Sequence, residues 1–139
     1  MKVSIKCDYA CRAIEEMAKQ YRNGQPIQTN QIAGRQAIPA NYLVQILNEL
    51  KTKGLIQSRR GMAGGYVLAK PPSEITFGEV VRAIEGDVLN LDHLRAAKCP
   101  RELHNVWKQI KMAAEKVAEA TTFDMIVASA NSEQAMYYI

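Results

Sequence analysis

The first hydrophobic pattern covers residues 4–21, where apolar positions recur at steps of three and four. This spacing places them on one face of an α-helix. Ser4 stands before the pattern as a candidate N-cap, and Gly24 and Pro26 follow it in the order typical of a helix end. The sequence therefore predicts an amphipathic helix with an apolar face of Ile5, Tyr9, Ala10, Ala13, Ile14, Met17, Ala18 and Tyr21.

Two shorter helical patterns come next, separated by a tight turn at residues 36–39. Thr29 is expected to cap the first, over residues 30–36, and Pro39 fits the first turn of the second, which runs to about Lys53. Such a pair, with the second helix polar on its free side, is typical of a helix-turn-helix. The apolar stripe of the second helix is Leu43, Ile46, Leu47 and Leu50, and its polar side carries Asn41, Tyr42, Gln45, Asn48 and Glu49. Asn and Gln side chains can pair with adenine edges, although each of these residues could equally face only water.

A basic, glycine-rich stretch follows the helices. Two short apolar runs, at residues 55–56 and 66–69, flank a loop with three glycines, which predicts a β-hairpin because glycine adopts the positive φ of tight turns. Arg59 and Arg60 stand at the mouth of this turn. Arginine suits phosphate oxygens and guanine edges, so the hairpin is either the wing of a winged helix-turn-helix or an ordinary solvated hairpin.

The second half of the chain contains two further helical patterns. The first follows a cap at Ser73 or Thr76 and ends at Gly86, and the irregular stretch of residues 87–100 separates it from the second, at 101–120. The second pattern has a heptad-like seam of Leu103, Val106, Ile110, Ala113, Val117 and Ala120. This seam predicts a homodimer, with packing against the first helix as the alternative. The apolar end of the tail, residues 131–139, is expected to dock on its own domain or on the partner.

Composition narrows the function classes. A chain of 139 residues is expected to form one globular protein, and a net charge of +4 with a pI near 9.0 favours an anionic partner. No apolar run is long enough to span a membrane and the first residues lack a signal peptide, which predicts a cytoplasmic protein. No nucleophile elbow, zinc helix signature or P-loop is present, so we expect no enzyme activity.

Several short motifs resemble those of the Rrf-type winged-helix transcriptional regulators, the superfamily of IscR, NsrR and CymR. The most specific is Arg-Gly-x-x-Gly-Gly-Tyr-x-Leu-Ala-x-Pro-Pro over residues 60–72. The other matching positions are Met1, Lys2, Ser4, Tyr9, Ala10, Tyr42, Leu43, Gln45, Ile75, Thr76, Ala83, Glu85 and Gly86. The resemblance covers nearly the whole chain and is closest to the CymR-type members, which lack a cluster.

The resemblance implies a mostly α protein with a small β-hairpin wing. Residues 1–86 would form the winged helix-turn-helix domain, residues 87–100 an effector or sensor loop, and residues 101–139 the dimerisation helix with a docked tail. A homodimer of this kind would bind double-stranded DNA at a palindromic operator, with the third helix in the major groove and Arg60 in the minor groove. The candidate DNA contacts are Gln28, Thr29, Asn30, Pro39, Ala40, Asn41, Tyr42, Gln45, Arg59, Arg60, Gly61 and Gly64. Family members often have Ser where Pro39 stands and Glu where Val44 stands, so the operator preference cannot be taken from a relative.

Three cysteines leave the sensing chemistry open. Many members of the family hold an iron–sulfur cluster through three cysteines in the loop, but this loop has only Cys99. Asp8 matches a position from which some relatives supply a ligand to the cluster of the other subunit. Cys7 and Cys11 flank Asp8 in the sequence. The alternatives are buried structural thiols, a disulfide switch, or an unusual cluster or metal site.

We therefore predict a dimeric, sequence-specific DNA-binding regulator that acts as a repressor, in cysteine, sulfur or redox metabolism, and has no resident cofactor. The alternative is a thiol-based or iron–sulfur redox or metal sensor in which Cys7, Cys11 and Cys99 control binding to DNA or to a protein partner. A protein or a small molecule could be the effector.

Overall fold

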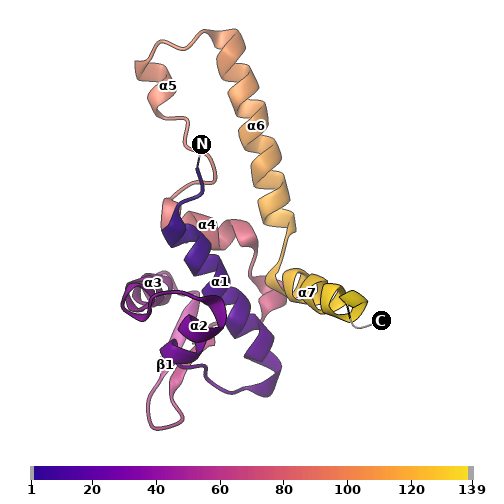
Figure 1. Cartoon of the computed structure of the whole chain (residues 1–139). Coiled ribbons are helices and arrows are strands. Elements are labelled where there is room, and N and C mark those ends of the chain that lie inside the picture. The colour runs from indigo at the N-terminus through magenta and orange to yellow at the C-terminus, as the bar shows by residue number, and fades with distance from the viewer. Residues whose placement is uncertain (1, 138–139) are drawn as a thin grey trace.

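The computed structural model describes the backbone of residues 2–137 and the side chains of residues 2–133. Helices dominate, and one antiparallel hairpin is the only sheet among these residues (Figure 1). The elements are α1 (Ile5–Gln20), η1 (Tyr21–Asn23), α2 (Thr29–Gln36), α3 (Ala40–Thr52), β1 (Ile56–Arg59), β2 (Gly65–Leu68), η2 (Pro72–Glu74), α4 (Phe77–Glu85), α5 (His93–Ala96), α6 (Arg101–Ala120) and α7 (Phe123–Tyr137).

Helix α1 is the centre of the N-terminal half of the chain, with α2, α3, α4 and the hairpin around it. The side chain of Ser4 accepts a hydrogen bond from the Cys7 backbone N–H, as a helix N-cap should. Most of the predicted apolar face is buried, but Ile5 and Tyr21 at its two ends are 66% and 39% exposed. The stripe predicted for the third helix is confirmed, since Leu43, Ile46, Leu47 and Leu50 are all buried.

The start of α2 differs from the prediction. The N-cap is Gln28 and not Thr29, which is the first helical residue. The side chain of Gln31 turns back and accepts from the Gln28 backbone N–H at 2.9 Å, so a longer amide replaces the expected hydroxyl as the capping group. Helix α2 ends at Ala37, whose φ of 54° produces the sharp turn into α3.

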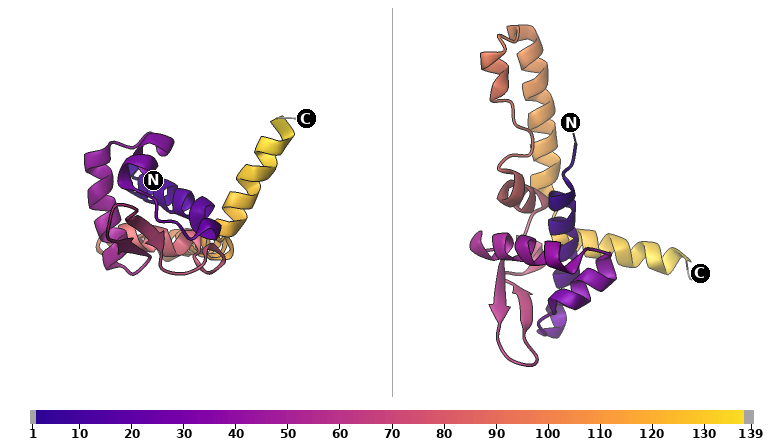
Figure 2. Two further views of the ribbon diagram at one scale, coloured as in Figure 1. Left: turned by 90° about the horizontal axis from the view of Figure 1, so that it is seen from below. Right: turned by 60° about the vertical axis from the view of Figure 1, so that its left-hand side comes forward.

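The hairpin pairs Ile56 with Leu68 and Arg59 with Gly65, and it is joined to the segment before α2 by a bridge between Ile27 and Tyr66. Gly65 has a φ of 150°, and a Cβ at this position would lie 2.5 Å from the carbonyl oxygen of Ile27. Glycine is therefore required for the strand to approach so closely. Figures 1 and 2 show the hairpin and α6 extending from α1 in opposite directions.

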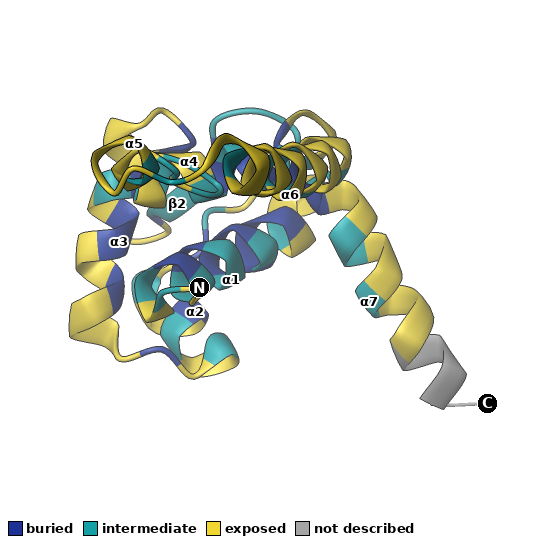
Figure 3. Ribbon diagram, turned by 90° about the horizontal axis from the view of Figure 1, so that it is seen from above, coloured by how far each residue is buried: buried dark blue, intermediate teal, exposed yellow. Residues whose placement is uncertain are grey.

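Helix α4 is capped by Thr76, whose hydroxyl accepts from the Glu79 N–H, and it ends at Gly86. The stretch of residues 87–100, predicted to be irregular, contains the short helix α5. Helix α6 has the predicted bounds and packs on α4 only near its C-terminal end, where Ala118 and Glu119 lie against Gly78. Most of its length is exposed, as Figure 3 shows.

A separate helix, α7, follows α6 where the sequence predicted only a tail. Its first residue, Phe123, is buried and stacks on Phe77 of α4 with ring centroids 6.2 Å apart, so the start of α7 is anchored against α4. The predicted docking of residues 136–139 lies outside the described side chains.

None of the described helices is both long enough and apolar enough to cross a membrane. The mostly helical fold with a β-hairpin wing is confirmed.

Candidate nucleic-acid interface

Helix α3 presents a free face made of the residues predicted to contact DNA. The buried stripe fixes the rotation of the helix, so the residues between the buried positions must face outward. Ala40, Asn41, Tyr42 and Gln45 are all exposed. Val44 is exposed as well, at 45%, which places an apolar side chain in the middle of this polar face.

Two contacts from α1 support α3. The ring of Tyr9 packs edge-on against the ring of Tyr42, with centroids 5.8 Å apart. Within α1, the guanidinium of Arg12 lies over the ring of Tyr9, 5.4 Å from its centroid. Further along, Lys6 Nζ donates to Glu49 Oε1 at 2.5 Å, and this hydrogen bond raises the pKa of Lys6 above its usual value.

A buried carboxylate holds α2 in place. Glu16 on α1 is only 4% exposed and accepts from Gln36 Nε2 at 2.6 Å and from Lys19 Nζ at 3.2 Å. Arg35 Nη1 lies 3.8 Å away. A buried charge is costly unless it is paired, so this cluster fixes the end of α2 against α1 and with it the angle between α2 and α3.

The start of α2 contacts the wing. Gln28 Nε2 donates to the backbone carbonyl of Met62 at 3.4 Å, and both residues are exposed. Thr29 is half-buried and Asn30 is exposed beside it. The residues predicted to contact phosphate at the start of α2 therefore lie next to the wing loop. Met62, in the same loop, is 100% exposed. The sequence did not single it out, because a methionine beside glycines has no charge or polarity to mark it.

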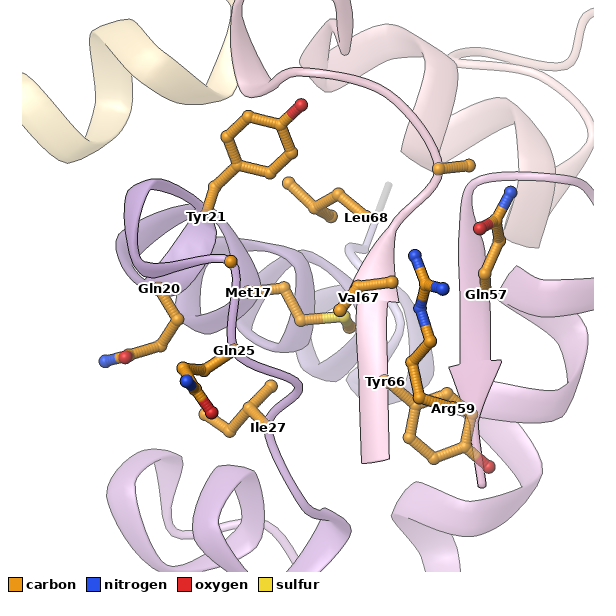
Figure 4. A pocket seen from close by; sticks show the side chains of 12 residues that line it. Met17, Gln20, Tyr21, Gln25, Ile27, Gln57, Arg59, Tyr66, Val67 and Leu68 are labelled. Carbon is orange, nitrogen blue, oxygen red and sulfur yellow. The ribbon is translucent and has the colours of Figure 1, made fainter. Parts of the chain in front are cut away.

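The two wing arginines have different surroundings. Arg59 is on strand β1 and lines a cavity of about 410 Å³ between the hairpin, α1 and η1. Its side chain extends back along the strand toward Gln57, as Figure 4 shows. Both arginines are exposed, but Arg60 lies in the loop after the strand.

The two candidate glycines of the wing also differ. Gly61 is exposed with a φ of 106°. Gly64 is buried, and its N–H already donates to the Gly61 carbonyl at 2.9 Å. A Cβ on Gly64 would collide with the Arg59 backbone oxygen, so this residue is needed for the loop conformation.

The cysteines are separated within one chain. Cys7 is buried and Cys11 half-buried on α1, whereas Cys99 precedes the end of α6 that lies far from α1 (Figure 1). A hydrogen bond with Cys7 and burial raise the pKa of the Cys11 thiol, and the same hydrogen bond lowers the pKa of Cys7. The Sγ of Cys99 donates to the Pro100 carbonyl at 3.6 Å.

Asp8, the fourth residue of the predicted redox or metal group, is paired within its own helix. Its carboxylate forms an ion pair with Arg12 Nη2 at 2.6 Å. Among the described residues, no three His, Cys, Asp or Glu side chains are grouped closely enough to hold a metal ion. The donors present in one chain therefore do not fit an iron–sulfur cluster.

An exposed polar helix, a second helix packed across it and a basic hairpin beside both define a winged helix-turn-helix protein that binds DNA and regulates transcription. The chain belongs to the Rrf2 family, described as iron-dependent transcriptional regulators, whose pattern matches residues 3–129.

Individual relatives agree with this assignment. The chain is 33% identical over 138 residues to the HTH-type transcriptional regulator CymR of Bacillus subtilis, covering 99% of this chain and 97% of that protein. The solved structure of IscR from T. potens superposes with a TM-score of 0.83 at 32% identity, covering 99% and 97% of the two chains. The structure of CymR, the global cysteine regulator of B. subtilis, gives a TM-score of 0.77 at 29% identity, covering 93% and 98%.

Proposed function

We propose that the protein is a homodimeric, sequence-specific repressor that binds palindromic operators in the cytoplasm. The observation that carries this proposal is the hydrogen bond from Gln28 to Met62, because it joins the start of α2 to the wing and makes the helix-turn-helix and hairpin one surface. In this arrangement α3 enters the major groove, where Asn41 and Gln45 pair with base edges. The exposed methyl groups of Val44 fit a thymine methyl.

The wing contacts the adjacent minor groove in this proposal. Arg60 supplies the charge that a narrow minor groove attracts, and the apolar Met62 lies beside it. The starts of α2 and α3, from Gln28 to Asn30 and from Pro39 to Ala40, face the phosphates. Gly61 lets the loop backbone approach the DNA, while Gly64 acts through the loop conformation.

Dimerisation rests on the exposed apolar side chains of α6. Val106, Ile110 and Val117 are 51%, 42% and 68% exposed, and a solvated helix would rarely keep such a row. We assign residues 1–86 to DNA binding, residues 87–100 to effector sensing and residues 101–139 to dimerisation. The buried side chain of Phe123 packs on Phe77 and so connects the dimerisation segment to the DNA-binding segment.

The regulated process that we favour is cysteine or sulfur metabolism. The similarity to the global cysteine regulator of B. subtilis supports this assignment, as does a sensor loop with one cysteine. The relatives are transcriptional regulators, and we assign no catalytic role to any residue.

The test is selection of bound duplexes from a pool with a randomised centre, at a fixed salt concentration. We expect enrichment of an inverted repeat whose half-sites are one helical turn or a multiple of it apart. Enrichment of single half-sites would contradict the dimer, and an unenriched pool would contradict sequence-specific recognition.

A further inference from the structure

A second cavity, of about 570 Å³, opens at the N-terminal end of α1, on the side where α4 and the following loop pack. Cys7 and Cys11 both line it, and so does the Asp8 side chain between them. The two cysteines are four residues apart, which places them on neighbouring turns of the same helix face. The other walls are mainly apolar and include Phe77, Val81, Val88 and Leu89.

We propose that Cys7 and Cys11 form a two-thiolate binding site for a monovalent, thiophilic metal ion of the Cu(I) type. The ion enters through the cavity and is held between the two sulfur atoms. Each thiol releases its proton on binding, so two S–H bonds are exchanged for two S–Cu bonds and no electron is transferred. The site lies on the DNA-binding half and does not involve the loop of residues 87–100 as a ligand.

The choice of ion follows from the donors. Thiolates are soft ligands and select soft ions such as Cu(I). Structural zinc needs four ligands and iron–sulfur clusters mostly four thiolates, but among the described residues no three His, Cys, Asp or Glu side chains are placed to hold a metal ion together, and the Asp8 carboxylate is paired with Arg12. A monovalent d10 ion is satisfied by two sulfur ligands. Because Cys7 is only 4% exposed, a bare ion reaches it more easily than a bulky electrophile.

The surroundings connect this site to the helix-turn-helix. Asp8 pairs with Arg12, and Arg12 Nη1 donates at 3.2 Å to the carbonyl of Gln36, the last residue of α2 before the turn into α3. Two thiolates and one monovalent cation leave a net negative charge beside Asp8. This charge attracts the Arg12 guanidinium away from the turn and from its place over Tyr9. Metal binding should therefore weaken DNA binding, a consequence that rests on the proposed function.

The binding test uses the full chain under anaerobic conditions, with Cu(I) in competition with a coloured chelator such as bicinchoninate. We expect one ion per chain, lost in both Cys7→Ser and Cys11→Ser and retained in Cys99→Ser, the matched control. Circular dichroism checks that each variant is folded. Loss of binding in Cys99→Ser, or unchanged binding in Cys11→Ser, would overturn the proposal.

A measurement on the unmodified protein guards against variants that fail to fold. Thiol alkylation followed by peptide mass spectrometry should show that Cu(I) protects Cys7 and Cys11 and leaves Cys99 reactive. Equal reactivity of all three thiols with and without Cu(I) contradicts the site. Protection that resists the chelator but is reversed by a reductant indicates a disulfide and also contradicts it.

Gel shifts test the connection to DNA separately. We expect Cu(I) to weaken operator binding about fivefold or more in the wild type and Cys99→Ser, and not in Cys11→Ser. If Cu(I) binds with the expected stoichiometry and operator binding stays unchanged, the connection through Arg12 is wrong while the metal site stands. If no operator binds under any condition, the proposed function fails instead.

Discussion

The side-chain amide of Gln28 donates to the main-chain oxygen of Met62 at 3.4 Å and so connects the start of α2 to the tip of the wing. The two residues are 34 positions apart in the sequence and come from different structural elements. The hydrogen bond is exposed and long, so it positions the wing more than it stabilises the fold.

Gln28→Ala should lower operator affinity about two- to tenfold, because the loss of one hydrogen bond is worth about 0.5–1.5 kcal/mol. The midpoint of thermal unfolding should hardly change. Gln25→Ala is the matched control, since Gln25 is also exposed and precedes α2 by a few residues. Equal affinities of the two variants would argue against the connection between α2 and the wing.

Arg60→Ala should weaken DNA binding and reduce the slope of log affinity against log salt by about one unit, as expected for one lost phosphate neutralisation. Arg59→Ala is the neighbouring control. Because Arg59 extends back along β1 toward Gln57, its replacement should leave the slope nearly unchanged. DNA-binding titrations of both variants over a range of salt concentrations give the two slopes. Equal slopes would contradict the proposal that Arg60 contacts phosphate and Arg59 does not.

Gly65→Ala should destabilise the protein by more than about 1 kcal/mol, because the new methyl group would meet the Ile27 backbone at a positive φ. Gly34→Ala provides the opposite case. Gly34 is exposed within α2 and has open space around it, so alanine should stabilise the helix by up to about 1 kcal/mol. Chemical denaturation gives both values, and a stable Gly65→Ala variant would contradict the close approach.

Ile110→Glu should convert the dimer into a monomer by placing a charge in the apolar row of α6. Gln109→Glu adds the same charge to the neighbouring exposed position and should remain dimeric. Sedimentation velocity over a range of concentrations distinguishes the two states. A monomeric wild-type protein at all concentrations would refute the dimer.

The ion pair of Asp87 and Lys111 predicts a pH effect. Lys111 Nζ donates to Asp87 Oδ2 at 2.9 Å, and this hydrogen bond lowers the pKa of Asp87 below its ordinary 3.8. The stabilisation is therefore complete above the unfolded-state pKa and is lost as the pH falls through the lower folded-state pKa. Since both side chains are accessible to water, solvent screens the pair and the effect on stability should be small. Asp87→Asn should lower the melting temperature at neutral pH, and the difference should shrink in acid.

Local patterns determined much of this protein. The spacing of Leu43, Ile46, Leu47 and Leu50 defined both the helix and the face it leaves free, because one rotation buries all four side chains. The glycines of residues 61–65 defined the hairpin in the same way, since only that residue type allows the required backbone. The apolar seam of α6 could also be predicted, from the heptad-like spacing of its apolar residues.

Contacts between distant segments could not be read in this way. The sequence alone did not distinguish Arg59 from Arg60, whose difference depends on where β1 lies against α1. It treated Thr29 as the cap because a hydroxyl is the commoner choice, whereas the observed cap is completed by Gln31. It also missed α7, whose position depends on Phe123 stacking on Phe77 from another helix.

The sequence by itself therefore determined α1, α3, α4, α6 and the hairpin, together with the free face of α3 and the basic wing, because periodicity and backbone freedom act over a few residues. Only the tertiary structure decided that Gln28 meets Met62 and that Cys7, Asp8 and Cys11 share a cavity with α4. It also decided that Arg12 bridges α1 to the helix-turn-helix turn. These relationships depend on how separate helices pack, and packing is fixed by the whole core rather than by any one stretch of chain.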